Sequence, residues 1–152
     1  MPICCFALIF NMPNVIAPAV DISASLYIGD ADSFMRLMFG DQSERGALCV
    51  NKWFRKIVGA APLEFDYYEL SNGGYFVAPK GESIQTEAPN DFAADMSCEA
   101  AGLVVCLYAY SHLAYEIGPQ GGWADHLTNQ YFALRCYAVD HPESALILAS
   151  VD

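Results

Sequence analysis

Hydrophobic and polar residues alternate in two short runs near the middle of the chain, a pattern typical of antiparallel strands. The runs cover residues 64–70 and 74–78 and flank Ser-Asn-Gly-Gly at positions 71–74. Asn-Gly readily takes the positive φ angles of a tight turn, so the sequence predicts a β-hairpin over residues 64–78. Pro79 is expected to end the second strand, because proline has no N–H to donate to a strand ladder.

Helical periodicity occurs upstream of this hairpin. From Ser43, a candidate N-cap, to Val58, apolar residues recur at the spacing of one helix face. Gly59 fits the left-handed position that follows many helices. The opposite face carries four of the seven basic residues in the chain: Arg45, Lys52, Arg55 and Lys56. A basic face can contact phosphate, but a solvated helix face is the commoner role.

The longest apolar segment lies downstream. Nearly every residue over 100–117 is apolar, and a helix that is apolar on all sides belongs in the centre of a fold. Ser97 is placed to cap this helix, and Glu99 puts a negative charge in its first turn, where the helix dipole is positive. Two further helices are predicted, over residues 123–139 and from Pro142 to about residue 151.

The remaining signals complete the prediction of the fold. Asp140 is spaced from Glu143 as in a capping box, and residues 83–87 and 92–95 are weaker strand candidates on either side of a Pro-Asn turn signal. We expect these strands to continue the hairpin as a meander. The prediction is an α+β fold, with a small antiparallel sheet of three to four strands packed against about four helices. The 152 residues fit a single domain, 1–152, with one core.

The first 20 residues carry no charged side chain and contain an apolar run over residues 3–10. A signal peptide is the obvious alternative, but the segment lacks a basic start, and asparagine and proline interrupt the apolar stretch. The run is also too short to span a bilayer. We expect an irregular apolar arm, of open role, packed on the core or on a neighbouring subunit.

The charge and cysteine content limit the kinds of partner and site that this protein can have. The formal net charge of −11 argues against ordinary nucleic-acid binding, which requires lysine and arginine to displace counterions from phosphates. An acidic surface suits solubility, a basic protein partner or imitation of DNA. None of the six cysteines forms a C-x-x-C pair, so a zinc or thioredoxin-like site has no support. Four of them lie in apolar helical patterns, which indicates reduced thiols in a cytoplasm.

The three histidines, His112, His126 and His141, are the first candidates for catalysis. Two of them follow an aspartate, but neighbours on a helix point in different directions, so adjacency alone gives no hydrogen bond. We expect His112 to be a core histidine and His141 to have a capping or turn role. The chain has no P-loop, nucleophile-elbow, zinc-protease or EF-hand motif. We therefore predict no catalytic residues, no metal site and no cofactor, with an enzyme that uses a Cys or His as the unsupported alternative.

Acidic residues are concentrated in the second half of the chain. After Lys80 there are ten Asp or Glu residues and a single basic residue, Arg135. The negative electrostatic field of these acids would attract a basic surface, for example the DNA channel of a nuclease. The acids are scattered along the sequence, however, and do not copy the regular spacing of DNA phosphates. A terminal acid also opposes the dipole of the last helix. The acidic interaction candidates are Asp95, Glu99, Asp140, Glu143 and Asp152.

The hairpin concentrates aromatic residues. The predicted faces hold Tyr67, Tyr75 and Val77 on one side, and Phe65, Tyr68 and Phe76 on the other. Antiparallel sheets usually bury one face and expose the other to water. Packing within the fold is the simpler interpretation, and a protein-binding surface is the alternative. Tyr68 and Tyr75 therefore join the interaction candidates.

The hairpin and the rest of the chain contain a set of short motifs: Tyr67-Tyr68, the Leu-Ser-Asn-Gly-Gly-Tyr-Phe of residues 70–76, Ala78-Pro79, Met96-Ser97, Ala100-Ala101-Gly102, His141-Pro142-Glu143 and Asp152. In these motifs the chain, from about Phe34 to Asp152, resembles the ArdB/KlcA family of antirestriction proteins. One departure is Cys98-Glu99, where family members often have Ala-Asp. The acidic charge is kept, so the resemblance stands.

This resemblance implies an antirestriction protein of plasmids and other mobile elements that inhibits host type I restriction-modification enzymes. We expect the protein to act through protein contacts without catalysis, in the cytoplasm, on the restriction enzyme or an associated DNA-processing protein. We expect neither sequence-specific nucleic-acid binding nor a membrane location, and a homodimer is compatible with the sequence. The alternative is an acidic DNA mimic that competes for the DNA groove of the restriction enzyme.

Overall fold

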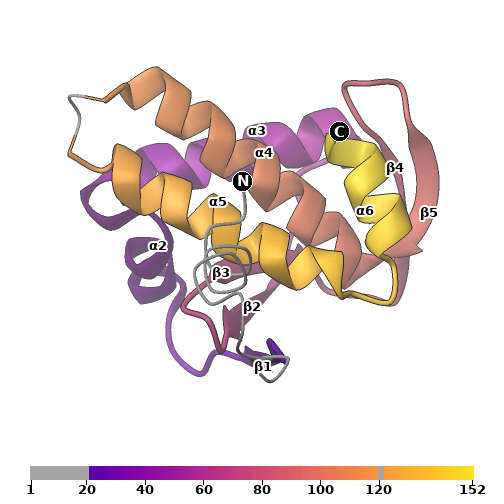
Figure 1. Cartoon of the computed structure of the whole chain (residues 1–152), viewed down its shortest axis with the longest axis horizontal. Helices are drawn as coiled ribbons and strands as arrows, with labels where there is room; N and C mark the ends of the chain where they lie inside the picture. The colour runs from indigo at the N-terminus through magenta and orange to yellow at the C-terminus, as the bar shows by residue number, and fades with distance from the viewer. Residues whose placement is uncertain (1–20, 120–121) are drawn as a thin grey trace, which may run out of the picture.

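The computed structural model describes residues 21–119 and 122–152 and has the predicted α+β composition (Figure 1). The apolar arm over residues 1–20 lies outside the described residues. In chain order the elements are β1 (Ala24–Leu26), α2 (Ala31–Phe39), a 3-10 turn (Gly40–Gln42), α3 (Ser43–Val58), β2 (Phe65–Leu70), β3 (Tyr75–Pro79), β4 (Ser83–Glu87), β5 (Ala93–Ser97), α4 (Cys98–Ile117), α5 (Ala124–Val139) and α6 (Ser144–Val151). Helix α4 runs through the middle, and the β4–β5 ribbon stands beside α6 (Figure 1).

Strands β2 and β3 pair antiparallel and form the predicted hairpin. In the turn, Gly73 has a φ of 88°, as expected, but Asn72 does not take a positive φ. The Asn72 side chain acts instead: its Oδ1 accepts from the Gly74 N–H at 3.1 Å, and its Nδ2 donates to the Ala133 carbonyl of α5 at 2.9 Å. The asparagine therefore fastens the turn to a helix, which its turn preference alone does not predict.

Side chains from two helices, rather than another strand, close the outer edge of β3. The Val77 N–H donates to Cys106 Sγ of α4 at 3.5 Å, and the thiol donates to the Val77 carbonyl at 3.6 Å. Two residues earlier, the Tyr75 N–H donates to Gln130 Oε1 of α5 at 2.9 Å, and the Tyr110 hydroxyl of α4 donates to the Tyr75 carbonyl at 2.7 Å. Because a buried polar group without a partner costs about 1–3 kcal/mol, these contacts allow the edge to lie in the core.

Helix α4 is the predicted central helix, and all of its side chains from Ala100 to Leu107 are buried. Its length and composition would allow it to cross a bilayer, but most of it lies inside the described part of the protein. Gly102 brings the helix against β3, because a Cβ at this position would lie 2.4 Å from the Val77 carbonyl oxygen and 2.6 Å from the Ala78 Cβ. The predicted central helix is therefore confirmed as a core helix.

The strands divide into two sheets, which corrects the predicted meander. One sheet has the order β1-β2-β3, and β4 pairs only with β5. The physical reason is the closed edge of β3, since α4 and α5 occupy the position where a fourth strand would pair. The ribbon β4–β5 is joined to the rest of the fold mainly through α3, α4 and α6.

Two elements near the start were not predicted. Strand β1 pairs with β2 through Ala24 opposite Leu70 and has only three residues, mostly exposed, so it shows no alternation. Helix α2 begins at an ordinary signal, because Asp30 Oδ1 accepts from the Ser33 N–H at 2.8 Å. Phe34 is one of its fully buried residues, and its ring packs on the hairpin.

Two predicted caps are wrong. Ser43 is the first residue of α3 rather than its cap, because the 3-10 turn leads directly into the helix. Asp140 and Glu143 do not form a capping box: Asp140 ends α5, and the Glu143 carboxylate turns towards Ser97. Helix α6 consequently starts at Ser144, two residues after Pro142.

The aromatic hairpin packs on both faces. Phe34 of α2 meets Tyr67 and Tyr75, with ring centroids 5.0 and 5.8 Å apart. On the opposite face, Tyr68 stacks at 4.8 Å on the buried phenylalanine paired with it. Phe65 lies on the Tyr67 face, because alternate residues of a strand point the same way, so its predicted placement with Tyr68 is wrong. None of these rings is fully exposed, which favours the packing interpretation.

Replacing Gly102 with Ala should destabilise the protein, although alanine normally favours a helix over glycine by about 1 kcal/mol. The new methyl group would overlap the β3 backbone, and overpacking of this kind typically costs about 1–3 kcal/mol. Urea denaturation followed by circular dichroism measures the change, with Ser111→Ala, at an exposed position of the same helix, as the control. A Gly102→Ala protein as stable as the parent would contradict the close contact between α4 and β3.

Candidate functional site

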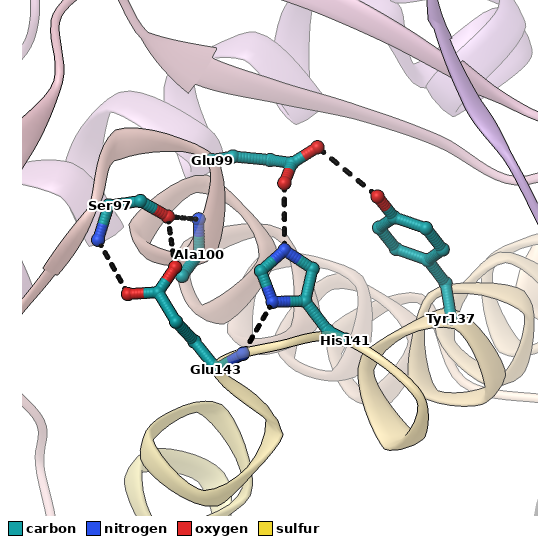
Figure 2. Close-up of polar contacts among 6 residues, drawn as sticks. All are labelled: Ser97, Glu99, Ala100, Tyr137, His141 and Glu143. Atoms are coloured by element: carbon teal, nitrogen blue, oxygen red, sulfur yellow. Dashed lines mark hydrogen bonds and ion pairs between the residues drawn. The ribbon is translucent and has the colours of Figure 1, made fainter.

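A cluster of polar side chains joins the start of α4 to the junction between α5 and α6 (Figure 2). Ser97 caps α4, and its Oγ accepts from the Ala100 N–H at 3.1 Å. Glu143 holds Ser97 with both carboxylate oxygens: Oε1 accepts from the Ser97 N–H at 2.9 Å and Oε2 from the Ser97 hydroxyl. We call the following five residues the polar clasp: Ser97, Glu99, Tyr137, His141 and Glu143.

His141 forms the second half of the polar clasp. Its side chain is 4% exposed, and both ring nitrogens have partners. The Glu143 N–H donates to Nδ1 at 3.0 Å, and because a backbone N–H can only donate, the ring proton lies on Nε2. Nε2 donates to Glu99 Oε2 at 2.7 Å, and the Tyr137 hydroxyl donates to Glu99 Oε1 at 3.2 Å (Figure 2).

These contacts shift the pKa values of two groups in opposite directions. The hydrogen bond from His141 holds the pKa of Glu99 below its ordinary value, against the opposing effect of burial. Burial raises the pKa of Tyr137 to about 12, and the neighbouring Glu99 charge adds to this shift. Glu99 is therefore an anion and Tyr137 a neutral donor at physiological pH.

The arrangement suits a structural role. Each imidazole nitrogen and carboxylate oxygen of the polar clasp has a partner inside the protein. Proton transfer to a substrate needs a titratable group that faces an accessible space, whereas His141 is buried. Within residues 21–119 and 122–152, no group of three or more His, Cys, Asp or Glu side chains is arranged to hold a metal ion.

Four of the seven predicted interaction residues lie in this region. Glu99 and Glu143 belong to the polar clasp and are only partly exposed. Tyr68 lies beside it: burial raises the pKa of Tyr68, and the charge of Glu99 raises it further. Asp140 is exposed and precedes His141 in the chain. The clasp thus binds two of the predicted acids internally and leaves a third at its border.

The other three candidates belong to different parts of the fold. Asp152 Oδ1 pairs with Arg135 Nη2 at 2.9 Å, and this cation offsets the unfavourable charge at the end of α6. Asp95 is exposed on β5. Tyr75 is half-buried against α2, and α5 holds its backbone. The structure therefore does not gather the seven candidates into one patch, and their role in binding stays a prediction.

The remaining histidines and the central cysteine have structural partners. His112 Nε2 lies 2.6 Å from Glu116 Oε1, and its side chain is 29% exposed, so it is not the fully buried histidine predicted. His126 Nε2 lies 3.0 Å from the Met38 carbonyl oxygen. Burial raises the pKa of the Cys106 thiol to about 12, which keeps it protonated and poorly nucleophilic.

The sequence analysis missed Gln130, which holds the hairpin turn. Its Oε1 accepts from the Tyr75 N–H, and its Nε2 donates to the Gly73 carbonyl, both at 2.9 Å. A signal was available, because this polar residue lies between Leu127 and Leu134 on the buried side of α5. A buried glutamine on an apolar helix face indicates backbone groups that need a partner.

The fold and the polar clasp together define a small acidic α+β protein whose motif residues hold elements together. The family model described as antirestriction protein matches residues 64–152, which is more than half of the chain. This range includes the hairpin, both strands of the ribbon, the polar clasp and the last three helices. The chain therefore belongs to the antirestriction protein family.

Relatives of known name cover most of the chain. An antirestriction protein KlcA of Escherichia coli is 36% identical over 123 residues, 78% of this chain and 86% of the relative. Another KlcA of Escherichia coli is 30% identical over 148 residues, 93% and 100% of the two chains. A solved structure, from work on KlcA and ArdB described as showing "antirestriction activity against Type I DNA restriction systems in vivo but not in vitro", matches with a TM-score of 0.78 and 33% identity. That match covers 91% of this chain and 100% of the solved one.

The lowered pKa of Glu99 predicts a pH-dependent contribution to stability. Because Glu99 binds a proton less readily in the folded chain, its contribution is present above the ordinary pKa of 4.5 and is lost as the pH falls below that value. Glu99→Gln should lower the free energy of unfolding by about 1–2 kcal/mol at neutral pH, and by less in acid. Urea denaturation across this pH range measures both effects.

The matched control is Glu82→Gln. Glu82 is exposed, and its side chain makes no hydrogen bond within the described residues, so this variant removes only a charge. This variant should keep the stability of the parent at neutral pH. A Glu99→Gln protein that loses stability in acid as steeply as the parent would show that Glu99 does not stabilise the fold through the polar clasp.

Proposed function

We propose that this protein inhibits host type I restriction-modification enzymes through protein contacts, without catalysis. The observation that carries the proposal is the match of nearly the whole fold to the solved structure from the work on KlcA and ArdB, which is described as active against type I systems. The match covers 91% of this chain at 33% identity. The family model covers residues 64–152, which include the hairpin, the central helix and the polar clasp. The proposed place of action is the cytoplasm, where such enzymes meet incoming DNA.

The contacts of the reactive side chains support action without catalysis. His141 and His112 are bonded to glutamates, His126 lies on a backbone carbonyl, and Cys106 is a buried thiol with a raised pKa. Nucleophilic catalysis needs an accessible nucleophile with a base beside it. Each of these groups instead has a partner that explains its position in the fold.

The charge distribution favours protein contacts over DNA mimicry. Two of the acids are neutralised, Glu116 by Arg45 at 3.0 Å and Asp152 by Arg135 at 2.9 Å. Helix α3 also presents exposed cations, including Lys52, on the surface of an acidic protein. A DNA mimic needs a continuous negative surface with the spacing of phosphates. On this protein, these cations interrupt the negative surface.

The description of the KlcA and ArdB work adds a second argument. A DNA mimic that fills the DNA groove should inhibit purified enzyme as well as enzyme in cells. Activity "in vivo but not in vitro" is instead what a protein would show if it required a further cellular component, such as a DNA-processing protein associated with restriction. We extend this to the present chain, whose partner would be the restriction enzyme itself or that associated protein. A membrane is not part of the proposal, and a homodimer is compatible with it.

A plating assay tests the proposed function. Unmodified phage should plate on a host with a type I restriction system almost as well as on a host without one, provided that the host makes this protein. The purified protein should leave DNA cleavage by the purified restriction enzyme unchanged. Modified phage, which the enzyme does not cut, controls for general effects on phage growth.

Two results would count against the proposal. Restriction of unmodified phage at full strength in cells that contain the folded protein would rule out the antirestriction function. Inhibition of the purified enzyme that weakens as salt is added would favour the DNA mimic, because competition for a phosphate-binding groove is strongly salt-dependent.

A further inference from the structure

A groove of about 540 Å³ lies between the C-terminal end of α3 and the β4–β5 ribbon. Residues 56–59 form the helix wall, and residues 85–87 and 93–95 form the strand wall. Gly59, with a φ of 97°, ends the helix at this point, as the sequence predicts. The volume is in the range of small-molecule sites, and the groove is open to solvent.

The strand wall carries two carboxylates on the same face of the ribbon. Gln85 pairs with Asp95, and Glu87 pairs with Ala93. Paired residues of an antiparallel ribbon point to the same face, and so do residues two positions apart in one strand. Glu87 and Asp95 therefore share a face, and both are exposed.

These two carboxylates have no cation of their own. Within the described residues, neither Glu87 nor Asp95 takes part in an ion pair. Lys56 lines the helix wall, but its Nζ lies 4.9 Å above the centre of the Trp53 ring, in a cation–π contact. The end of α3 adds the partial negative charge of its last carbonyl groups. The groove is therefore open to solvent and carries two unpaired carboxylates, while its one lysine is engaged with the Trp53 ring.

We propose that this groove binds an arginine or lysine side chain on an extended segment of a protein partner. A guanidinium or ammonium group between Glu87 and Asp95 would supply the missing cation, while the walls of the groove would enclose its aliphatic part. The inference rests on the proposed function only in taking the partner to be the restriction enzyme or its associated protein. It assigns a contact role to Asp95 and adds Glu87, which the sequence analysis did not single out.

A labelled peptide of alternating glycine and arginine tests the groove directly. Its binding to the full chain is followed by fluorescence anisotropy at physiological ionic strength. The peptide with citrulline in place of arginine has nearly the same shape without the charge, and should not bind. The double variant Glu87→Gln/Asp95→Asn should bind the arginine peptide at least about fivefold more weakly than the parent.

A matched control separates the groove from the overall acidity of the protein. The double variant Glu82→Gln/Asp125→Asn removes the same charge at exposed positions that do not line the groove. It should bind the peptide within about twofold of the parent, because distant exposed charges are screened by salt. A second variant, Ala93→Trp, fills the groove without changing the charge and should also weaken binding. Circular dichroism checks that each variant is folded.

The possible outcomes decide between the alternatives. Equal losses in the two double variants, or equal binding of the arginine and citrulline peptides, would overturn the groove as a binding site. The groove would also be overturned as a binding site if both variants, Ala93→Trp and Glu87→Gln/Asp95→Asn, bound the arginine peptide as tightly as the parent. Protection in the plating assay is a separate measurement. If the parent protein does not protect phage, the proposed function is rejected, and peptide binding still tests the groove. A groove variant that no longer binds the peptide should also lose protection.

Discussion

The contact between strand β3 and helix α4 is the constraint on which the rest of the fold depends. A strand edge that enters a core must give every backbone N–H and carbonyl group a partner. Cys106 serves both groups of Val77, and Gly102 removes the side chain that would hold the helix away. With this edge closed, β4 and β5 can pair only with each other, and the main sheet grows on the far side, where β1 joins β2.

The position of α4 also explains the role of the residues in the polar clasp. Its first turn brings Ser97 and Glu99 to the junction of α5 and α6, where Glu143 and His141 bind them. The residues that most resemble catalytic groups therefore hold helices together. A partner must use what remains exposed, and the unpaired acids beside the end of α3 line an open groove in that surface.

Much of this fold follows from local sequence signals. The hairpin, the buried helix and its Ser97 cap could be predicted, because alternation, continuous apolarity and capping depend on neighbouring residues. The split of the strands into two sheets could not, because it depends on a helix that follows them in the chain. The bond between His141 and Glu99 joins residues 42 positions apart, which no spacing rule connects. Gln130 is an intermediate case. The sequence shows a polar residue on an apolar helix face, but it does not show which backbone groups this residue binds.

Amide hydrogen exchange at Tyr75 and Val77 tests the closed edge most directly. Both N–H groups donate to helix side chains, at 2.9 Å to Gln130 and at 3.5 Å to Cys106. The structure predicts that they exchange as slowly as amides in the middle of α4, through global unfolding of the protein. Fast exchange of these two amides in the folded protein, as on an open strand edge, would contradict the dependence of the fold on this contact.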